Sequence, residues 1–219
     1  MPEENNASTP VQATAIPNVA SNAEILAPEN TPAANQAQVY GKSELLDAGK
    51  ILTEILEIKT GQVVADLGVG GGFFTLQAAR LVGEQGQVYA VDIMKEILND
   101  IESQARMAGL YNIKTIWSNL EMVGAAKIPE ETLHLAMLNN ILFQSQKHYE
   151  MLTEASRLIM PSGRLLIIDW SDTGPGFTPD AKMQVDPNKI ISQAQELGLI
   201  LEQKFQAGKY HFGLIFSKP

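Results

Sequence analysis

Five short apolar runs, most of them separated by stretches of helical periodicity, constrain the fold of this 219-residue chain more than any other feature. Four of the runs are continuously hydrophobic rather than alternating, which is typical of strands whose sheet is covered by helices on both faces. The pattern therefore predicts an α/β fold built on a parallel sheet. The runs are Val63–Leu67, Gln87–Val91, Ile113–Trp117, Leu133–Leu138 and Arg164–Asp169.

Helices and a final hairpin are expected to complete this sheet. Apolar residues recur at helical spacing after Ser43, which can cap a first helix. A late helix begins at Pro187 with Asp186 as its N-cap and stops before Gly198. Two last strands, joined by a short Gly-containing turn, should pair antiparallel. The other helices are Phe73–Val82, Met94–Ala108 and Lys147–Ile159, and the last strands are Leu199–Phe205 and Tyr210–Ser217.

The N-terminal segment has a different composition from the rest. Residues 1–38 contain no Lys, Arg, Gly or aromatic residue, and they hold five of the 11 prolines. Such a segment cannot bury enough apolar surface to offset the entropy of ordering it. We therefore expect a disordered tail over residues 1–38 and one domain over residues 39–219. The tail has no secretory signal pattern and no later run could span a bilayer, so we expect a cytoplasmic protein without a membrane span.

Charge and cysteine content exclude several classes of function. The chain carries 16 Lys+Arg against 25 Asp+Glu, a formal net charge of -9, which argues against a general binder of nucleic acid or anionic membranes. The chain contains no cysteine, so it offers no disulfide, no cysteine nucleophile and no cysteine ligand for zinc or an iron–sulfur cluster. We assign no metal ligands.

A glycine-rich turn follows the first predicted strand directly. Asp66, Gly68, Gly70 and Gly72 form the pattern Asp-x-Gly-x-Gly-x-Gly, and glycine lets a backbone turn sharply and approach a ligand closely. The dinucleotide fingerprint would need a small residue where Phe73 stands. No Gly-Lys-Ser/Thr follows, so a phosphate-binding P-loop is excluded as well.

With this turn, the sequence resembles the class I S-adenosylmethionine-dependent methyltransferases, over the stretch from Tyr40 to the C-terminus. Three motifs in order carry the resemblance, namely VVADLGVGGGFFTLQAA, VYAVDI and MPSGRLLIIDW. The chain is most similar to the small-molecule enzymes, a group that includes the quinone-biosynthesis methyltransferases. The resemblance implies a Rossmann-like, mostly parallel seven-stranded sheet with a C-terminal antiparallel hairpin. It also implies S-adenosyl-L-methionine as cofactor and a small-molecule methyl acceptor.

The same resemblance assigns roles to residues near the first two strand ends. The glycine turn and the following helix N-terminus would receive the methionine end of the cofactor. Asp66 would hold amides of that turn and the α-amino group of the cofactor. Asp92 would accept both ribose hydroxyls, although it also fits as the N-cap of the next helix. Ile93 would lie against the adenine.

Further cofactor contacts are implied after the third and fourth strands. Asn119 would accept a hydrogen bond from the adenine amino group, and the Leu120 backbone N–H would reach the ring. A simple turn residue is the alternative for Asn119. Asn139 would help to hold the methionine end. The family often has an acidic residue where this chain has His134, and we expect that difference to affect details of the fold.

Residues for catalysis are less clearly marked. Methyl transfer from a sulfonium is an in-line displacement, so alignment of the two reactants can supply most of the catalysis. A general base is needed only if the acceptor must lose a proton. His148, Asp169, Asp172 and His211 are candidates near the expected cleft, and each also fits a surface or packing role.

Several alternatives are weighed against this hypothesis. Amino-methylating nucleic-acid enzymes carry Asn/Asp-Pro-Pro-aromatic after the fourth strand, but Ile141 and Leu142 replace both prolines here. The absence of cysteine excludes cysteine-dependent arsenic methyltransferases and cytosine-C5 enzymes. A non-catalytic S-adenosylmethionine-binding sensor or partner subunit remains open. We expect the acceptor to be selected by loops over the strand ends, which are Trp170–Val185, Tyr40–Leu46 and Gln144–Tyr149.

Overall fold

The computed structural model of the chain describes residues 46–171, 179–180 and 183–219. The expected disordered tail (residues 1–38), the expected cap Ser43, Tyr40, Asp172 and most of the loop between residues 170 and 185 lie outside the described residues. The described elements are α2 (Ala48–Lys50), the π-helical turn η1 (Ile51–Ile55), β1 (Val63–Leu67), α3 (Phe73–Val82), β2 (Gln87–Asp92), α4 (Lys95–Met107), β3 (Ile113–Trp117), β4 (Leu133–Asn139), the 3-10 turn η2 (Leu142–Gln144), α5 (His148–Leu158), β5 (Ile159–Trp170), α6 (Pro187–Glu196), β6 (Ile200–Gly208) and β7 (His211–Ser217).

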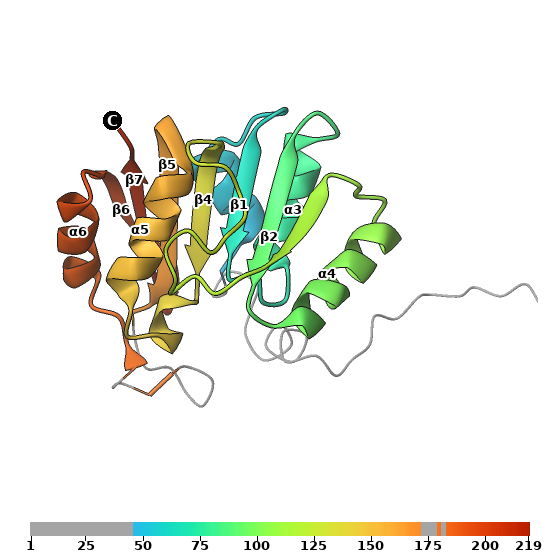
Figure 1. Cartoon of the computed structure of the whole chain (residues 1–219). Helices are drawn as coiled ribbons and strands as arrows, with labels where there is room; N and C mark the ends of the chain where they lie inside the picture. The colour runs from blue at the N-terminus through green and yellow to red at the C-terminus, as the bar shows by residue number, and fades with distance from the viewer. Residues whose placement is uncertain (1–45, 172–178, 181–182) are drawn as a thin grey trace, which may run out of the picture.

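The strands form one seven-stranded sheet in the order β3-β2-β1-β4-β5-β7-β6 (Figure 1). Neighbouring strands from β3 to β5 run parallel, whereas β7 is antiparallel to both β5 and β6. The predicted α/β class, the mostly parallel sheet and the terminal antiparallel hairpin are confirmed.

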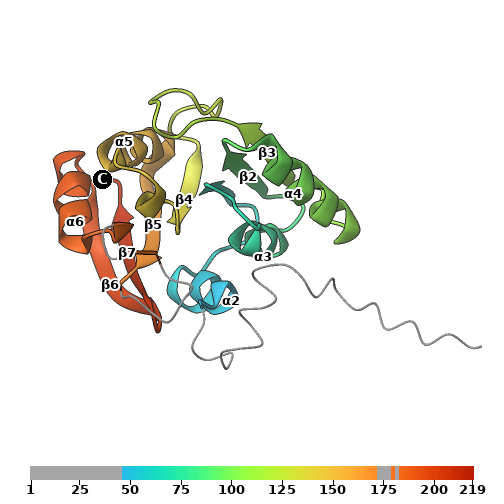
Figure 2. The ribbon, with the colours of Figure 1, turned by 90° about the horizontal axis from the view of Figure 1, so that it is seen from below.

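Helices bury both faces of this sheet, as the continuous apolar runs predict. Along β4, Leu135 and Met137 pack with η1 and α3, whereas Ala136 and Leu138 pack with α5 and α6 on the opposite face. Figure 2 shows α5 and α6 on one side of the strands and α2 and α3 on the other. Each parallel strand is therefore apolar at consecutive positions because successive side chains enter two different cores.

The fifth strand is longer than expected, and it begins at Ile159 rather than Arg164. Ile159 pairs with Leu133, while Arg164 pairs with Leu135, so the intervening segment bulges out of the ladder. Ser162 lies in this bulge with a left-handed φ of 64°. The expected helix end at Ile159 is corrected to Leu158, because strand pairing takes the next residue.

His134 has a structural role at the opposite end of the sheet from the glycine turn. Its Nδ1 accepts a hydrogen bond of 3.1 Å from the backbone N–H of Val63. This contact joins the start of β4 to the start of β1. The histidine that stands where the family often has an acidic residue therefore helps to pair these two strands.

A buried ion pair fixes the long connection between β3 and β4. The Glu154 side chain is fully buried, and its carboxylate accepts hydrogen bonds from the amides of Gly124 (2.7 Å) and Ala126 (3.1 Å). Arg157 donates to both carboxylate oxygens, at 2.9 and 2.8 Å. Burial raises the pKa of Glu154, but the bonds from Arg157 and the two amides outweigh it and hold that pKa below its ordinary value.

Within the described ranges, no helix is long and apolar enough to cross a membrane.

We predict that Glu154→Ala lowers the free energy of unfolding by about 3 kcal/mol, because it leaves Arg157 without its buried partner. The loss should be largest at neutral pH and should shrink as the pH falls through the carboxyl range, because the folded-state pKa of Glu154 is depressed. Urea unfolding followed by circular dichroism measures both effects. Glu54→Ala, which breaks an exposed pair with Lys50, is the control and should leave the transition unchanged.

Candidate functional site

Two adjoining cavities open at the carboxyl ends of β1, β2 and β4. The glycine-loop cavity has a volume of about 300 Å³. It is bordered by Asp66, the turn from Gly68 to Gly71, Asn139 and Asn140. The β3-side cavity, of about 220 Å³, is bordered by residues 118–121, Ser145 and Met151. Both cavities share Gly68, Asp92, Ile93, Ile141 and Gln144.

The glycine turn passes directly under the loop that follows β4. Gly68 has a φ of 89°, and a Cβ atom there would lie 2.7 Å from Cγ1 of Ile141. Only glycine satisfies both the left-handed backbone and the close approach. Gly70 and Gly71, by contrast, have open space where a Cβ would stand, on the side of the cavity.

Most amides of this turn are already paired within the protein. The N–H groups of Gly68 and Val69 donate to the carbonyl of Val91, that of Gly72 to Val69, and that of Gly70 to the Asp92 carboxylate. The expectation that Asp66 holds amides of the turn is corrected, because the amides of Gly68, Val69 and Gly70 bond to β2 and that of Gly72 bonds within the turn, whereas the backbone N–H that Asp66 accepts is that of Thr75 on α3. In the first turn of α3, the Thr75 N–H bonds to Asp66, so the N–H groups of Phe73 and Phe74 remain as main-chain donors.

Asp66 lies below the turn, where it joins three elements. Its carboxylate accepts hydrogen bonds from the Thr75 hydroxyl on α3 (2.6 Å) and from the Asn139 amide at the end of β4 (3.4 Å). Burial raises the pKa of Asp66 to about 7, although the bonds from Thr75 and Asn139 oppose the rise. The charge of Asp92 adds to it.

Asp92 lies at the end of β2, where the two cavities meet. Its carboxylate accepts from the amides of Gly70 (3.3 Å) and Met94 (2.9 Å), so it fixes the turns after both β1 and β2. The N-cap residue of α4 is Met94 rather than Asp92, because the helix begins at Lys95. Ile93 is 56% exposed and borders both cavities.

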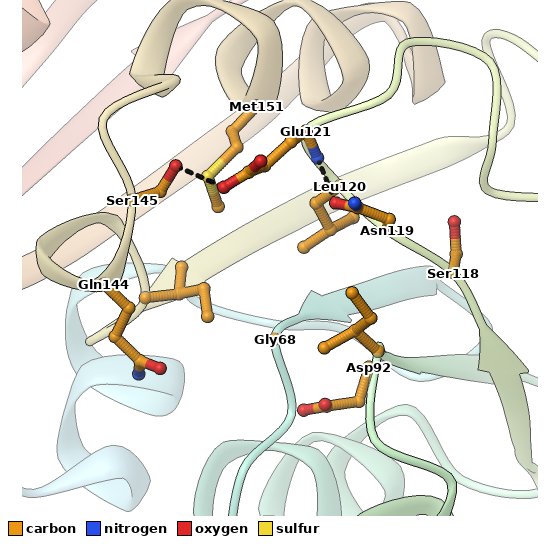
Figure 3. Close-up of a pocket in the computed structure, with 11 residues that line it drawn as sticks. Gly68, Asp92, Ser118, Asn119, Leu120, Glu121, Gln144, Ser145 and Met151 are labelled. Atoms are coloured by element: carbon orange, nitrogen blue, oxygen red, sulfur yellow. Dashed lines mark hydrogen bonds between the residues drawn. The ribbon is translucent and has the colours of Figure 1, made fainter.

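The far wall of the β3-side cavity is closed by a bridge between two loops. Glu121 accepts a hydrogen bond of 2.7 Å from the Ser145 hydroxyl and forms a 3.4 Å ion pair with Lys147. Figure 3 shows this bridge on the opposite side of the cavity from Asp92. The side-chain oxygen of Asn119 accepts from the Glu121 amide at 2.9 Å, which is the turn role left open for it. A carbonyl oxygen has a second lone pair, so Asn119 keeps acceptor capacity toward the cavity.

The three histidine and aspartate candidates differ in their relation to the cavities. Asp169 is fully buried and accepts from the amides of Trp170 (2.8 Å) and Phe143 (3.3 Å). Burial raises the pKa of Asp169 to about 6. His148 donates through Nε2 to the Leu142 carbonyl at 2.9 Å. Among the described residues, neither side chain borders a cavity, and both hold the loop after β4 in place.

His211 is the candidate that contacts a cavity residue. Its Nε2 lies 3.2 Å from the side-chain amide nitrogen of Asn140, which borders the glycine-loop cavity. Burial lowers the pKa of His211 to about 4, so the ring is neutral at physiological pH.

Sequence reasoning missed part of the cavity lining and one support. Thr75 carries a buried hydroxyl in the first turn of α3. A hydroxyl residue at the start of the helix that follows Asp66 could have indicated a contact with that carboxylate. No sequence pattern indicates that Ser145 approaches Glu121, because the two lie in different loops. The missed lining residues of the β3-side cavity are Ser118, Glu121, Ile141 and Met151, whereas Gln144 and Ser145 belong to the predicted acceptor loop Gln144–Tyr149.

A family model described as "Methyltransferase domain" matches residues 58–209, which include the glycine turn, Asp92 and every residue that borders the two cavities except Leu46. The chain belongs to the class I S-adenosylmethionine-dependent methyltransferases. The predicted family is therefore confirmed, and S-adenosylmethionine is the cofactor that this membership implies.

Two curated relatives are named as methyltransferases. The chain is 30% identical over 126 residues to the ubiquinone/menaquinone biosynthesis C-methyltransferase UbiE of Vibrio vulnificus, an alignment that covers 57% of this chain and 46% of that protein. It is 27% identical over 130 residues to the arsenite methyltransferase of Halobacterium salinarum, covering 59% of this chain and 32% of the relative. The chain thus spans less than half the length of these curated relatives.

A solved structure confirms the methyltransferase fold. The S-adenosylmethionine-dependent methyltransferase of Aquifex aeolicus superposes with a TM-score of 0.73, covering 87% of this chain and all of that one at 24% identity. This likeness supports the seven-stranded architecture.

The cavities fit the cofactor of this family. The open Cβ positions at Gly70 and Gly71 leave room for a ligand against the backbone. Among the described residues, the buried side-chain oxygen of Asn139 has no hydrogen-bond partner, and the Asp66 carboxylate lies beside it, so both can receive an ammonium group. Asp92 offers a carboxylate where the cavities meet. This set of acceptors suits a ligand with an α-amino group and ribose hydroxyls.

We predict that Asp66→Asn flattens the dependence of stability on pH. The folded-state pKa is about 7 against an ordinary value of 3.8, so the folded state keeps a proton that the unfolded state has lost. The free energy of unfolding should therefore fall as the pH rises from about 4 to about 7, and the amide variant should lose this component.

Urea unfolding across that pH range measures the slope. Asp169→Asn should remove a similar component that ends near pH 6, and the exposed Asp100→Asn should remove none. Parallel curves for wild type and Asp66→Asn would contradict the raised pKa of Asp66.

Proposed function

We propose that this chain transfers a methyl group from S-adenosylmethionine to a small-molecule acceptor. One observation carries the proposal. The carboxylates of Asp66 and Asp92, at the ends of adjacent strands, flank a glycine turn and border the same cavity. This is the arrangement expected at the carboxyl edge of an open α/β sheet that binds a nucleoside-containing ligand.

The two carboxylates would take opposite ends of the cofactor. Asp92 would accept the ribose hydroxyls, with Ile93 against the adenine. Asp66, with Asn139, would receive the α-amino group, and the first turn of α3 would receive the carboxylate. Gly68, Gly70 and Gly72 would shape the turn, as their left-handed φ values of 89°, 49° and 77° indicate.

The adenine end would lie in the β3-side cavity. Asn119 and the Leu120 backbone would contact the base there, while the Ser145–Glu121 bridge would hold the cavity wall together. The Ser145 hydrogen bond lowers the pKa of the Glu121 carboxyl, so the bridge favours the ionised form of Glu121.

When bound, S-adenosylmethionine supplies a methyl group activated by its sulfonium. The residues of this chain would orient that group toward the acceptor and keep the two reactants aligned. Among the described residues no His borders either cavity, and the bordering carboxylates of Asp66, Asp92 and Glu121 are given to the cofactor or to the cavity wall, so no general base is assigned.

The sequence argues against two classes of methyl acceptor, metalloids and the amino groups of nucleic acids. One relative is named as an arsenite methyltransferase, which implies a metalloid acceptor for that protein. This chain contains no cysteine thiol that could bind a metalloid. The loop after β4 carries Ile141 and Leu142 where nucleic-acid amino-methyltransferases carry prolines. We therefore favour an organic small molecule, in line with the quinone-pathway relatives.

We predict that Asp92→Ala weakens S-adenosylhomocysteine binding at least about tenfold, because two charge-assisted hydrogen bonds to the ribose are lost. Titration calorimetry on the full chain measures the effect. Asp100→Ala, which removes one exposed carboxylate from α4, is the matched control and should bind like wild type. An unchanged affinity for Asp92→Ala would remove the ribose assignment.

Calorimetry with NAD tests the cofactor class itself. Binding of NAD without binding of S-adenosylmethionine or S-adenosylhomocysteine would refute the proposed function.

Turnover is tested by a homocysteine-release screen across quinols, phenols, amines and carboxylates. Product formation with any of them supports the methyltransferase. Cofactor binding with silence across the whole panel would favour a non-catalytic cofactor-binding protein instead.

A further inference from the structure

The peptide unit that joins Ile93 to Met94 is held at both of its polar atoms. The indole N–H of Trp117 donates a hydrogen bond of 2.7 Å to the Ile93 carbonyl. The Met94 N–H donates a bond of 2.9 Å to the Asp92 carboxylate. A peptide unit is planar, so bonds at both of its polar atoms fix the orientation of the whole unit. This part of the turn between β2 and α4 can therefore rotate only if one of the two bonds breaks.

The same peptide unit lies in the part of the turn that faces the cofactor site. Asp92 and Ile93 border both cavities, and Met94 borders the glycine-loop cavity. The Asp92 carboxylate that accepts from Met94 also accepts from the Gly70 amide at 3.3 Å. The directions of the Asp92 carboxylate and of the Ile93 side chain therefore both depend on how this peptide unit is oriented.

Trp117 is placed for this contact rather than for packing. It is the last residue of β3, and its ladder partner on β2 is Asp92. Although it is large and apolar, Trp117 is 61% exposed, so burial of apolar surface contributes little to holding it there. An indole has a single hydrogen-bond donor, and Trp117 uses it on the Ile93 carbonyl. The Lys95 ammonium lies 4.3 Å from the ring centroid and holds the ring near the start of α4.

Helix α4 does not supply another partner for the Ile93 carbonyl. The N-cap residue is Met94, and the Leu98 N–H donates to the Met94 carbonyl at 3.3 Å. Loss of the indole N–H would leave the Asp92 carboxylate as the bond that holds this peptide unit. Asp92 and Ile93 would then sample more orientations, and ordering them around a ligand would cost binding free energy.

We propose that Trp117 is the positioning residue for the adenosine half of the cofactor site. Through the Ile93 carbonyl, it holds Asp92 toward the ribose and Ile93 toward the adenine. Trp117 itself borders neither cavity, so it acts through the turn and not by touching the ligand. The proposal rests on the proposed function, because the ribose and adenine contacts that it serves are assigned there.

Two ring variants separate the hydrogen bond from the bulk of the side chain. Trp117→Phe keeps a six-membered aromatic ring and lacks the N–H. Trp117→His keeps an N–H at Nε2, which stands at the same ring position as Nε1 of tryptophan, and lacks the six-membered ring. Titration calorimetry of S-adenosylhomocysteine on the full chain, at about pH 8 where an exposed histidine is neutral, measures the effect. Trp117→Phe should bind about two- to tenfold more weakly than wild type, and Trp117→His should restore most of the loss.

A shorter ligand tests which half of the site is affected. Adenosine has the ribose and adenine of the cofactor but lacks its α-amino and carboxylate groups. It should bind to wild type and should lose the same factor as S-adenosylhomocysteine in Trp117→Phe. Asn139→Ala, which changes the methionine end, should weaken S-adenosylhomocysteine and leave the affinity for adenosine unchanged.

Tyr111→Phe is the matched control for a polar group removed from an exposed aromatic side chain. Tyr111 follows α4, is 87% exposed and borders neither cofactor cavity, so this variant should bind both ligands like wild type. Thermal melting of every variant, followed by circular dichroism, sets a titration temperature at which all of them are folded. The affinities then report on the site rather than on unfolding.

Three results would overturn the proposal. They are wild-type affinity for S-adenosylhomocysteine in Trp117→Phe, equally weak binding by Trp117→His and Trp117→Phe, and a loss that adenosine does not share. In each of these cases wild type still binds S-adenosylhomocysteine, so the proposed function stands. Failure of wild type to bind S-adenosylhomocysteine would instead refute the proposed function.

Discussion

The buried carboxylate of Asp66 connects the parts of this structure on which the site depends. It lies at the end of β1 and is bonded to Thr75 on α3 and to Asn139 on β4. The glycine turn connects β1 to α3, and its Gly68 packs closely against Ile141 in the loop after β4. Because the carboxylate is buried, its pKa is raised to about 7, and a bound ammonium group would lower the cost of its ionisation.

Loops from distant parts of the chain are joined around this centre by single polar contacts. Asp92 holds the turns after β1 and β2 together, and Ser145 meets Glu121 across the β3-side cavity. Glu154, buried on α5, holds the connection that leads from that cavity into β4. Each contact pairs a carboxylate with donors, so the cavity wall is preorganised largely by negative charge.

The parallel strands could be located from the sequence, because burial of both faces of the sheet makes each strand a continuous apolar run. The bounds of β1 and β3 agree with the prediction to the residue. The start of β5 could not be predicted, because the pairing of Ile159 with Leu133 across a bulge depends on β4. Asp66 and Asp92 were found because each lies in a local motif at the end of a predicted strand. Thr75 and Ser145 were not, because their partners belong to other elements.

The sequence by itself determined the fold class, the family and the residues of the glycine turn, since apolar periodicity and glycine spacing are local properties of the chain. Tertiary structure decided which polar groups meet. It paired the amides of Gly68, Val69 and Gly70 with β2 rather than with Asp66. It buried Asp169 away from the cavities, and it brought His211 to Asn140 through the reversed direction of β7. These outcomes depend on strand order and on which loops meet at the edge of the sheet, which no local pattern encodes.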